Sequence, residues 1–196
     1  FPKLSLPVTF GKYIKFTPEM GVRGMFAMDL SEDEDYDRQK GVFDANAELS
    51  TTVLKVYNFS GRKIAKLKHS IEPSITYRYI PDVDQDDFPF FEPKAGFYDR
   101  HSLTYALTNR FITKTLMPDG SYGEYELGYF RLSQNYYFDK PFSPWSVEGY
   151  NGRDFSDIFA ELRFNFAENA SFKTEVYYNP YETNLNSYNA YLLLQN

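Results

Sequence analysis

The chain has 196 residues, no cysteine and a formal net charge of −6. The absence of cysteine excludes disulfide scaffolds, thiolate metal sites and cysteine nucleophiles, and the acidic balance argues against a nucleic-acid partner, because phosphate binding needs a basic face. Hydrophobic residues make up 42% of the chain, yet no run approaches the roughly 18 apolar residues of a membrane-spanning helix.

Aromatic residues are unusually abundant, with 18 Tyr and 19 Phe. Both favour β-strands, and tyrosine suits a membrane interface because its ring is apolar and its tip polar. Composition alone is also compatible with a water-soluble β-protein that is rich in aromatic residues. The periodicity of the sequence is therefore needed to choose between the two.

Alternation of apolar and polar residues recurs along most of the chain and predicts extended strands. The first candidate, Lys3–Phe16, has the weakest pattern. The other predicted strands are, in chain order, Met20–Leu30, Phe43–Val53, Ala65–Ile80, Arg100–Thr115, Tyr122–Phe138, Ile158–Phe166, Phe172–Tyr178 and Tyr188–Leu194.

The segment Ala65–Ile80 shows the alternation most clearly. Its odd positions are mostly apolar and its even positions mostly polar, which separates two faces in a strand and mixes them in a helix. Pro73 interrupts this pattern because it removes a ladder donor, so it implies either a β-bulge or locally weakened pairing. A second irregularity is a slip of phase near Tyr129–Phe130, which predicts a β-bulge.

The predicted connections alternate between long and short. Long loops follow Leu30 and span Pro81–Asp99 and Asp139–Asp157, whereas short turns lie at Ser60-Gly61, Pro118–Gly120 and Ala167–Ala170. This parity is expected of an up-and-down barrel, and a 16-residue strand tilted by about 45° rises roughly 37 Å, more than the apolar band of a membrane. The sequence therefore predicts an all-β fold, an antiparallel up-and-down transmembrane β-barrel, here a fragment of about eight strands from a larger barrel.

On this interpretation every second side chain meets hydrocarbon and its neighbours meet a watery interior. The side chains expected to face lipid are Leu67, Ile71, Ile75, Tyr77, Leu103, Tyr105 and Leu107. On the opposite face, Glu72 and Arg78 are expected to point toward the lumen.

The stretch His69–Phe91 is more specific than any periodicity. It contains Glu-Pro, then Tyr-x-Tyr-x-Pro, then Asp-Gln and a Pro, and an Asn-Arg-Phe strand follows. These motif positions are Glu72, Pro73, Tyr77, Tyr79, Pro81, Asp84, Gln85, Pro89, Asn109, Arg110 and Phe111. Over about 70 residues this part of the chain resembles the barrel domain of the lipopolysaccharide-assembly outer-membrane proteins, the LptD (OstA) family.

The resemblance implies a function. Members of the family form a very large barrel in the bacterial outer membrane that receives lipopolysaccharide from periplasmic bridge proteins and releases it into the outer leaflet through a seam between the first and last strands. A lipoprotein partner plugs the lumen. Because the matching motif lies mid-barrel, residues 1–196 are expected to be one partial barrel domain, truncated at both ends, without the seam strands or the periplasmic domain.

Two departures limit the resemblance. The cysteines that link the periplasmic domain to the barrel in some members are absent, so the disulfide-dependent maturation is not carried over. After Phe111 the chain reads Ile-Thr-Lys-Thr in place of the Gly-x-Asp-Arg of some members, which leaves the subfamily open.

Catalytic, metal and cofactor sites are not expected. The run Asp82–Asp87 resembles the start of a calcium loop but has Asp87 where an EF-hand needs glycine and Pro93 where it needs glutamate. The acidic run Glu32–Asp37 is interpreted as a hydrated external loop, with divalent-ion bridging of lipopolysaccharide phosphates as the alternative. His69 and His101, the only histidines, are expected at membrane interfaces, with a catalytic or metal pair as the alternative. No G-x-S-x-G nucleophile motif occurs.

The competing hypothesis is a complete, small eight-stranded outer-membrane barrel with a porin-like or adhesive role. The chain ends at Leu194-Gln195-Asn196, without the terminal aromatic residue of finished barrels, which favours the fragment. The third hypothesis is an outer-membrane enzyme, which would need a Ser/His/Asp-type cluster at the rim, with His69 and His101 as its only candidates.

Overall fold

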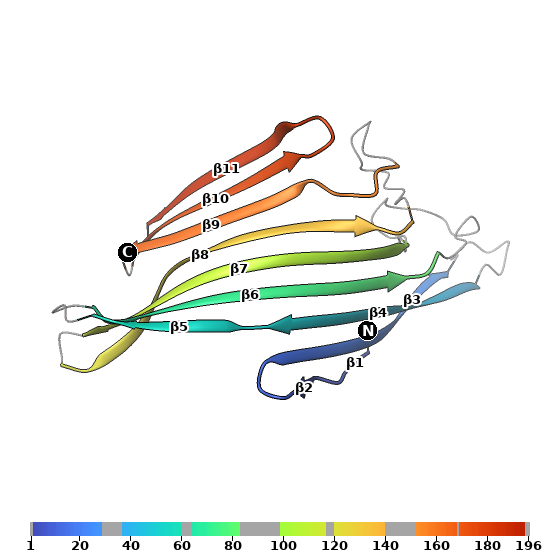
Figure 1. The fold of residues 1–196 in the computed structure, drawn as a ribbon. Helices are drawn as coiled ribbons and strands as arrows, with labels where there is room; N and C mark the ends of the chain where they lie inside the picture. The colour runs from blue at the N-terminus through green and yellow to red at the C-terminus, as the bar shows by residue number, and fades with distance from the viewer. Residues whose placement is uncertain are drawn as a thin grey trace.

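A computed structural model of the chain describes residues 2–28, 37–59, 64–82, 99–116, 120–139, 152–167 and 169–194. These residues form one antiparallel sheet of eleven strands in which each pass of the chain across the sheet lies beside the next (Figure 1). The strands are β1 (Lys3–Ser5), β2 (Val8–Phe10), β3 (Ile14–Met28), β4 (Asp37–Thr51), β5 (Val53–Asn58), β6 (Ile64–Ile80), β7 (Arg100–Leu116), β8 (Tyr122–Tyr137), β9 (Ile158–Ala167), β10 (Ala170–Asn179) and β11 (Asn184–Leu194).

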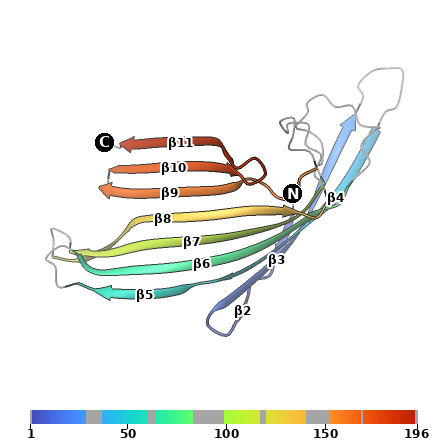
Figure 2. The ribbon, with the colours of Figure 1, turned by 45° about the horizontal axis from the view of Figure 1, so that its top comes forward.

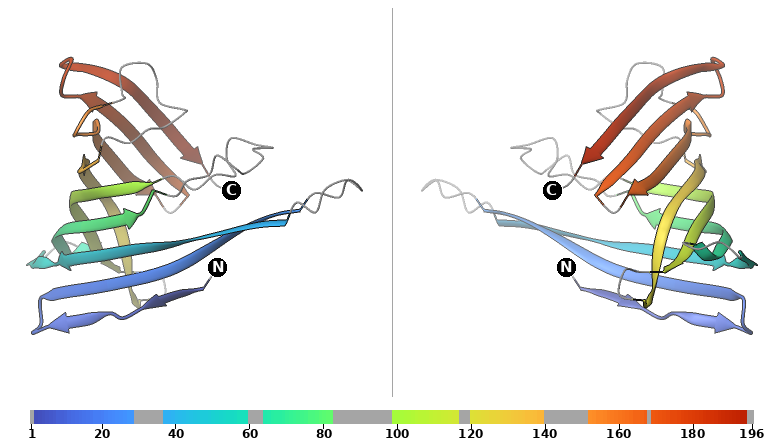
Figure 3. Two further views of the ribbon diagram at one scale, coloured as in Figure 1. Left: turned by 90° about the vertical axis from the view of Figure 1, so that its right-hand side faces the viewer. Right: turned by 90° about the vertical axis from the view of Figure 1, so that its left-hand side faces the viewer.

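The expectation of an all-β, antiparallel, up-and-down fold is confirmed. Within the described residues the sheet is open, with β1 and β2 at one edge and β11 at the other, and it is curved and twisted as a segment of a barrel wall would be (Figures 2 and 3). No helix in the described part of the chain is long and apolar enough to cross a membrane.

Two pairs of the eleven strands are single passes broken at one point. β1 and β2 pair with β3 in one continuous register, and they are separated at Leu6 and Pro7. β4 and β5 pair with β6 in one continuous register, separated at Thr52. Nine passes result, where about eight strands were expected.

The N-terminal segment differs from its expected extent. The interval Lys3–Phe16 is not one strand, because a turn at Gly11–Tyr13 folds β2 back onto β3. Gly11 takes a φ of 63°, a conformation that favours glycine. Accordingly β3 begins at Ile14, six residues before the predicted start at Met20.

Pro73 weakens pairing without forming a bulge. The ladder between β6 and β7 runs through Pro73 opposite Leu107 with no shift of register. On the other side, pairing stops after Ser74–Ser50 and resumes at Ile71–Val53 in the same register. The missing N–H of Pro73 therefore faces β4 and β5, and it accounts for the break between them.

The bulge expected near Tyr129–Phe130 lies slightly earlier. The pairs Phe111–Gly128 and Ile112–Glu126 leave Leu127 of β8 without a partner on β7. Because β8 carries one extra residue here, its odd- and even-numbered side chains exchange faces at this point. The alternation in the sequence locates the irregularity only to within a few residues. It cannot do better because aromatic side chains lie on both faces near the bulge.

The strand ends joined by the long connections lie at one end of the sheet, and most strand ends joined by short turns lie at the other, as Figure 1 shows. We call these the loop end and the turn end. The connection between β10 and β11 is an exception, since it lies at the loop end but consists of the short turn Pro180–Thr183. The side chain of Asn179 closes this turn by accepting hydrogen bonds from the backbone N–H groups of Tyr181 and Glu182.

Candidate membrane-facing surface and polar lining

The sheet has one apolar and one polar face, and the pairing registers carry the same division across all nine passes. We call the face that bears Ile71, Ile75 and Leu107 the apolar face, and the face that bears Ser70, Glu72 and Arg110 the polar face. Residues paired across two strands lie on the same face of the sheet. The pairing registers therefore assign each residue of the other strands to one of the two faces.

Exposure on the two faces is the reverse of that in a water-soluble protein. Large apolar side chains are exposed on the apolar face, among them Met20 at 60%, Phe43 at 44% and Phe164 at 43%, whereas only Val42 and Ala170 are buried hydrophobic residues among those described. On the polar face, Ser70 and Ser102 are only 3% exposed although no second layer covers them. Curvature crowds side chains on the inner side of a sheet, which identifies the polar face as the concave one.

The residues expected to face lipid all lie on the apolar face. Ile71, Ile75, Tyr105 and Leu107 are more than a third exposed. Leu67, Tyr77 and Leu103 lie in the same register and are partly covered by neighbours. This placement fits their expected role, but contact with lipid itself stays a prediction.

Aromatic side chains on the apolar face gather at the loop end. The ring of His101 stacks on Phe138 with centroids 4.4 Å apart and meets the edges of Tyr77 and Tyr79 at 5.6 and 5.4 Å. The cluster continues along the sheet through Phe43, Tyr136 and Phe155. His101 also shares a 2.8 Å hydrogen bond between its Nδ1 and the Oδ2 of Asp139.

A second histidine lies on the same face toward the turn end. His69 stacks on Phe111 with centroids 4.5 Å apart, and its Nε2 lies 3.2 Å from the Oδ1 of Asn109. The span from His69 to Tyr79 on β6 is about 33 Å of extended chain at roughly 3.3 Å per residue. A strand tilt of about 40° reduces this to about 25 Å, the height of the apolar band of an outer-membrane barrel.

The polar face carries a chain of ionic and hydrogen-bonded contacts across five strands. Arg110 of β7 pairs with Glu72 of β6, at 3.5 Å from Nε to Oε1, and with Glu126 of β8. The hydroxyl of Ser70 donates to Glu72 over 2.7 Å. The guanidinium of Arg110 also lies 5.4 Å from the ring centroid of Tyr129, which continues the chain toward β9.

The second half of this chain reaches β10. The hydroxyl of Tyr129 donates to Oε1 of Glu161 over 2.8 Å. Glu161 pairs with Lys173 at 3.1 Å, and Lys173 pairs with Glu175 at 2.6 Å. We call the whole set the polar ladder; its members are Ser70, Glu72, Arg110, Glu126, Tyr129, Glu161, Lys173 and Glu175. Each of its two cations, Arg110 and Lys173, is flanked by two carboxylates.

The family-motif residues do not form one cluster. In the Asn-Arg-Phe strand, Arg110 joins the polar ladder, whereas Asn109 and Phe111 surround His69 on the opposite face. Tyr77 and Tyr79 belong to the loop-end aromatic cluster. Pro81 follows the end of β6. The motif positions Asp84, Gln85 and Pro89, like the run Asp82–Asp87 beyond Asp82 and most of Glu32–Asp37, lie outside the described residues.

Several members of the polar ladder were not foreseen from the sequence. Glu126 and Tyr129 lie on β8, whereas Glu161 and Lys173 come from β9 and β10, and none of the four belongs to a motif. Strand parity assigns Tyr129 to the polar face only if the bulge is placed at Leu127 and not near Tyr129 itself. Among the described residues, no group of three His, Asp or Glu side chains is arranged to hold a metal ion.

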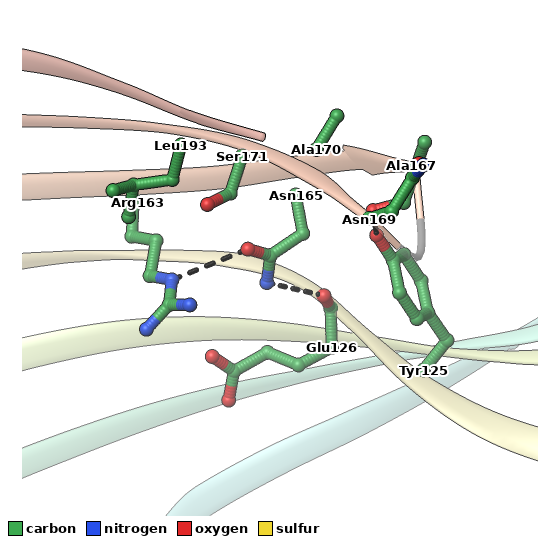
Figure 4. A pocket seen from close by; sticks show the side chains of 9 residues that line it. All are labelled: Tyr125, Glu126, Arg163, Asn165, Ala167, Asn169, Ala170, Ser171 and Leu193. Atoms are coloured by element: carbon green, nitrogen blue, oxygen red, sulfur yellow. Dashed lines mark hydrogen bonds between the residues drawn. The ribbon is translucent and has the colours of Figure 1, made fainter. Parts of the chain in front are cut away.

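A pocket of about 290 Å³ lies at the turn end, where β8 separates from β9 (Figure 4). Its lining is mainly polar and comes from β8, β9, β10, β11 and the turn between β9 and β10: Tyr125, Glu126, Arg163, Asn165, Ala167, Asn169, Ala170, Ser171 and Leu193. Asn165 lies at its centre, where Nδ2 donates to the backbone carbonyl of Glu126 over 2.8 Å and Oδ1 accepts from Nε of Arg163 over 3.2 Å.

One carboxyl group at the loop end has a raised pKa. The pKa of Asp99, which precedes β7, is raised by partial burial and then by the negative charges of Asp82 and Asp139. Desolvation and neighbouring carboxylates both disfavour the ionised form.

An open, curved antiparallel sheet with an exposed apolar face, aromatic clusters near its ends and a charged concave face has the architecture of the wall of an outer-membrane β-barrel. The family model of LptD, LPS transport system D, matches residues 1–195. The chain therefore belongs to the LptD family, whose members serve lipopolysaccharide transport at the outer membrane. No protein of curated function matches the chain significantly.

Proposed function

We propose that these nine passes form part of the wall of a barrel that transports lipopolysaccharide and inserts it into the outer leaflet of the outer membrane. In this proposal the apolar face contacts lipid and the polar face lines the lumen. The observation that carries it is the division between the faces, continuous through nine passes, with exposed apolar side chains on one face and the polar ladder on the other.

The aromatic clusters support a definite position in the bilayer. Rings with a polar edge are favoured at the two membrane–water interfaces. The His101 cluster and the His69–Phe111 stack lie on the apolar face about 25 Å apart along the membrane normal, by the estimate from strand rise and tilt. The apolar side chains between them, such as Ile71, Ile75 and Leu107, would then lie in the hydrocarbon.

The polar ladder provides a surface for a protein in the lumen. We propose that the lipoprotein plug contacts this concave face and that periplasmic bridge proteins deliver lipopolysaccharide to the barrel. Paired carboxylates flanking Arg110 and Lys173 leave an excess of acceptors, which suits a partner that presents hydrogen-bond donors or basic side chains.

Single cysteines test the facing of the sheet, since the chain has none of its own. In the intact protein in outer membranes, labels at Ile71, Ile75 and Leu107 should be quenched by nitroxide lipids and shielded from water-soluble maleimides. Matched positions on the polar face of the same strands, Lys68, Thr76 and Thr108, should behave oppositely. Equal accessibility of both sets to water would overturn the proposal.

Transport and partner contact need separate tests. Depletion of the intact protein should lower lipopolysaccharide at the cell surface, and unchanged levels would contradict the transport role. A photo-crosslinking residue at Thr76 or Arg131 on the polar face should capture the lumenal lipoprotein, whereas one at Ile75 or Leu132 on the apolar face should not. Capture of the lipoprotein from the apolar face alone would contradict the proposed facing.

A further inference from the structure

The ladder between β8 and β9 is much shorter than its neighbours. β7 and β8 pair over Ser102–Leu116, but β8 and β9 pair only over Gly128–Ser133. Toward the turn end, Tyr122–Leu127 of β8 and Asn165–Ala167 of β9 are not paired with each other. Figures 1 and 2 show the two strands separating there. We call this region the wedge.

The separation begins at two adjacent irregularities. Leu127 is the extra residue of the bulge, which turns β8 away from the plane of the sheet. At Gly128 the backbone of β9 approaches so closely that an added Cβ would lie 2.2 Å from the carbonyl oxygen of Arg163. The sequence thus places a glycine where the strands are closest and a bulge where they begin to separate.

Side chains bridge the wedge in place of a backbone ladder. Asn165 donates from Nδ2 to the carbonyl of Glu126 over 2.8 Å, and the hydroxyl of Tyr125 donates to the carbonyl of Ala167 over 2.7 Å. The pocket of about 290 Å³ lies between them (Figure 4). Across the described part of the wedge, side-chain bonds such as these thus stand in place of the backbone ladder that holds neighbouring strands together.

The loop end of the same strand pair is held differently. Ser156 bonds to β8 at three points: its N–H donates to the carbonyl of Asn135, its hydroxyl accepts from the N–H of Asn135, and its carbonyl accepts from Gln134. The N–H of Tyr137 also donates to the carbonyl of Asp154 over 2.7 Å. β8 and β9 are therefore clamped at the loop end and weakly joined at the turn end.

The wedge lies at the edge of the apolar band. Gly128 pairs with Phe111, which stacks on His69 near the turn-side boundary of that band. The unpaired segments extend beyond this level. Unpaired backbone groups are costly in hydrocarbon but not at a hydrated rim, so opening of the wedge there meets no large desolvation penalty.

We infer that the wedge is a hinge in the barrel wall. It opens and closes at the turn-side rim about a fixed point between Gly128 and Ser156, and Asn165 and Tyr125 act as the latch. The sections β1–β8 and β9–β11 move relative to each other while the ladders within each section stay intact. This inference concerns the mechanics of the wall and does not depend on what the barrel transports.

Pulsed electron paramagnetic resonance on the intact protein in membranes tests it. Spin labels at Lys114 and Asn169 span the wedge, and labels at Lys66 and Glu124 span two continuous ladders at the same rim; all four positions are exposed. The first pair should give two distances and the control pair one. Loss of the Asn165 amide in Asn165→Ala should raise the open fraction roughly two- to tenfold, the effect of one hydrogen bond.

Two further variants keep the result unambiguous. Tyr125→Phe removes only the hydroxyl and should shift the same equilibrium in the same direction. Asn189→Ala, a matched change of an exposed residue on β11, should leave both distance distributions unchanged. A single narrow distance across the wedge that neither latch variant alters would overturn the inference, as would equal broadening of the control pair.

Discussion

The guanidinium of Arg110 lies between the carboxylates of Glu72 and Glu126 and joins three neighbouring strands on the polar face. Its nearest approach to Glu72 is 3.5 Å, and all three side chains are about two-thirds covered. Removing the cation would leave two carboxylates close together on a half-buried face. Loss of a cation from the polar ladder should therefore lower the free energy of unfolding more than loss of any one of its carboxylates.

Arg110→Ala should lower the free energy of unfolding by about 1 to 2 kcal/mol, the usual effect of removing a charged hydrogen-bond partner from a partly covered site. Urea unfolding of the protein inserted in lipid vesicles would measure it. Arg78→Ala is the matched control, because Arg78 lies on the same face, is exposed and makes no ion pair with the described residues. Equal effects of the two substitutions would contradict a special role for Arg110.

Gly128→Ala should impair assembly of the sheet. The new Cβ would lie 2.2 Å from the carbonyl oxygen of Arg163, which is backbone and cannot move aside cheaply. Overpacking of this kind costs about 1 to 3 kcal/mol or more. Heat-modifiable mobility on gels would report the folded fraction. Gly41→Ala, whose Cβ would lie 3.8 Å from the carbonyl of Arg23, should fold normally, and a normal Gly128→Ala barrel would show that the strands are not this close.

Pro73→Ala should repair the break between β4 and β5. The substitution supplies an N–H on the side of β6 that faces Thr51 and Thr52, so one ladder bond can form and add about 1 kcal/mol. Hydrogen exchange at residues 51–53 should slow, and the urea midpoint should rise. Pro81→Ala, just beyond the end of β6, is the control and should change neither. Faster exchange at residues 51–53 in Pro73→Ala would contradict the assigned direction of the missing donor.

Asp99→Asn should stabilise the protein at neutral pH. The pKa of Asp99 is raised in the folded state by partial burial, Asp82 and Asp139, so the folded protein binds a proton more readily than the unfolded chain. The penalty is complete above the folded-state pKa and is relieved as pH falls through it. The stability gain should thus be present at neutral pH and vanish in acid. Asp154→Asn, a substitution of an exposed residue near the loop end, is the control. A stability gain in Asp99→Asn that grows as the pH falls would contradict this assignment.

The class of fold and the limits of the strands in the middle of the chain could be predicted from the alternation of apolar and polar residues. Ala65–Ile80 and Arg100–Thr115 differ from β6 and β7 by one residue at one end, because long alternating segments bounded by polar loops leave little freedom for their limits. The facing of Ile71, Ile75 and Leu107 also followed from alternation, since successive side chains of a strand must point to opposite faces.

Alternation failed where the backbone departs from a regular strand. It did not divide Lys3–Phe16 into β1, β2, a turn and the start of β3, and it placed the bulge near Tyr129 rather than at Leu127. It also left open the choice between a bulge and weakened pairing at Pro73. That choice depends on which neighbouring strand the missing N–H faces, and this is a property of the pairing and not of the strand itself.

The amino-acid sequence determined that the chain would form amphipathic strands and how each strand would face, because period-two patterning acts locally. Only the tertiary structure decided that Glu72, Arg110 and Glu126 meet, that Glu161 and Lys173 extend this contact to β10, and that β8 and β9 separate beyond Gly128. Each of these depends on the register between strands, which is set by hydrogen bonding, bulges and close backbone approach over the whole sheet.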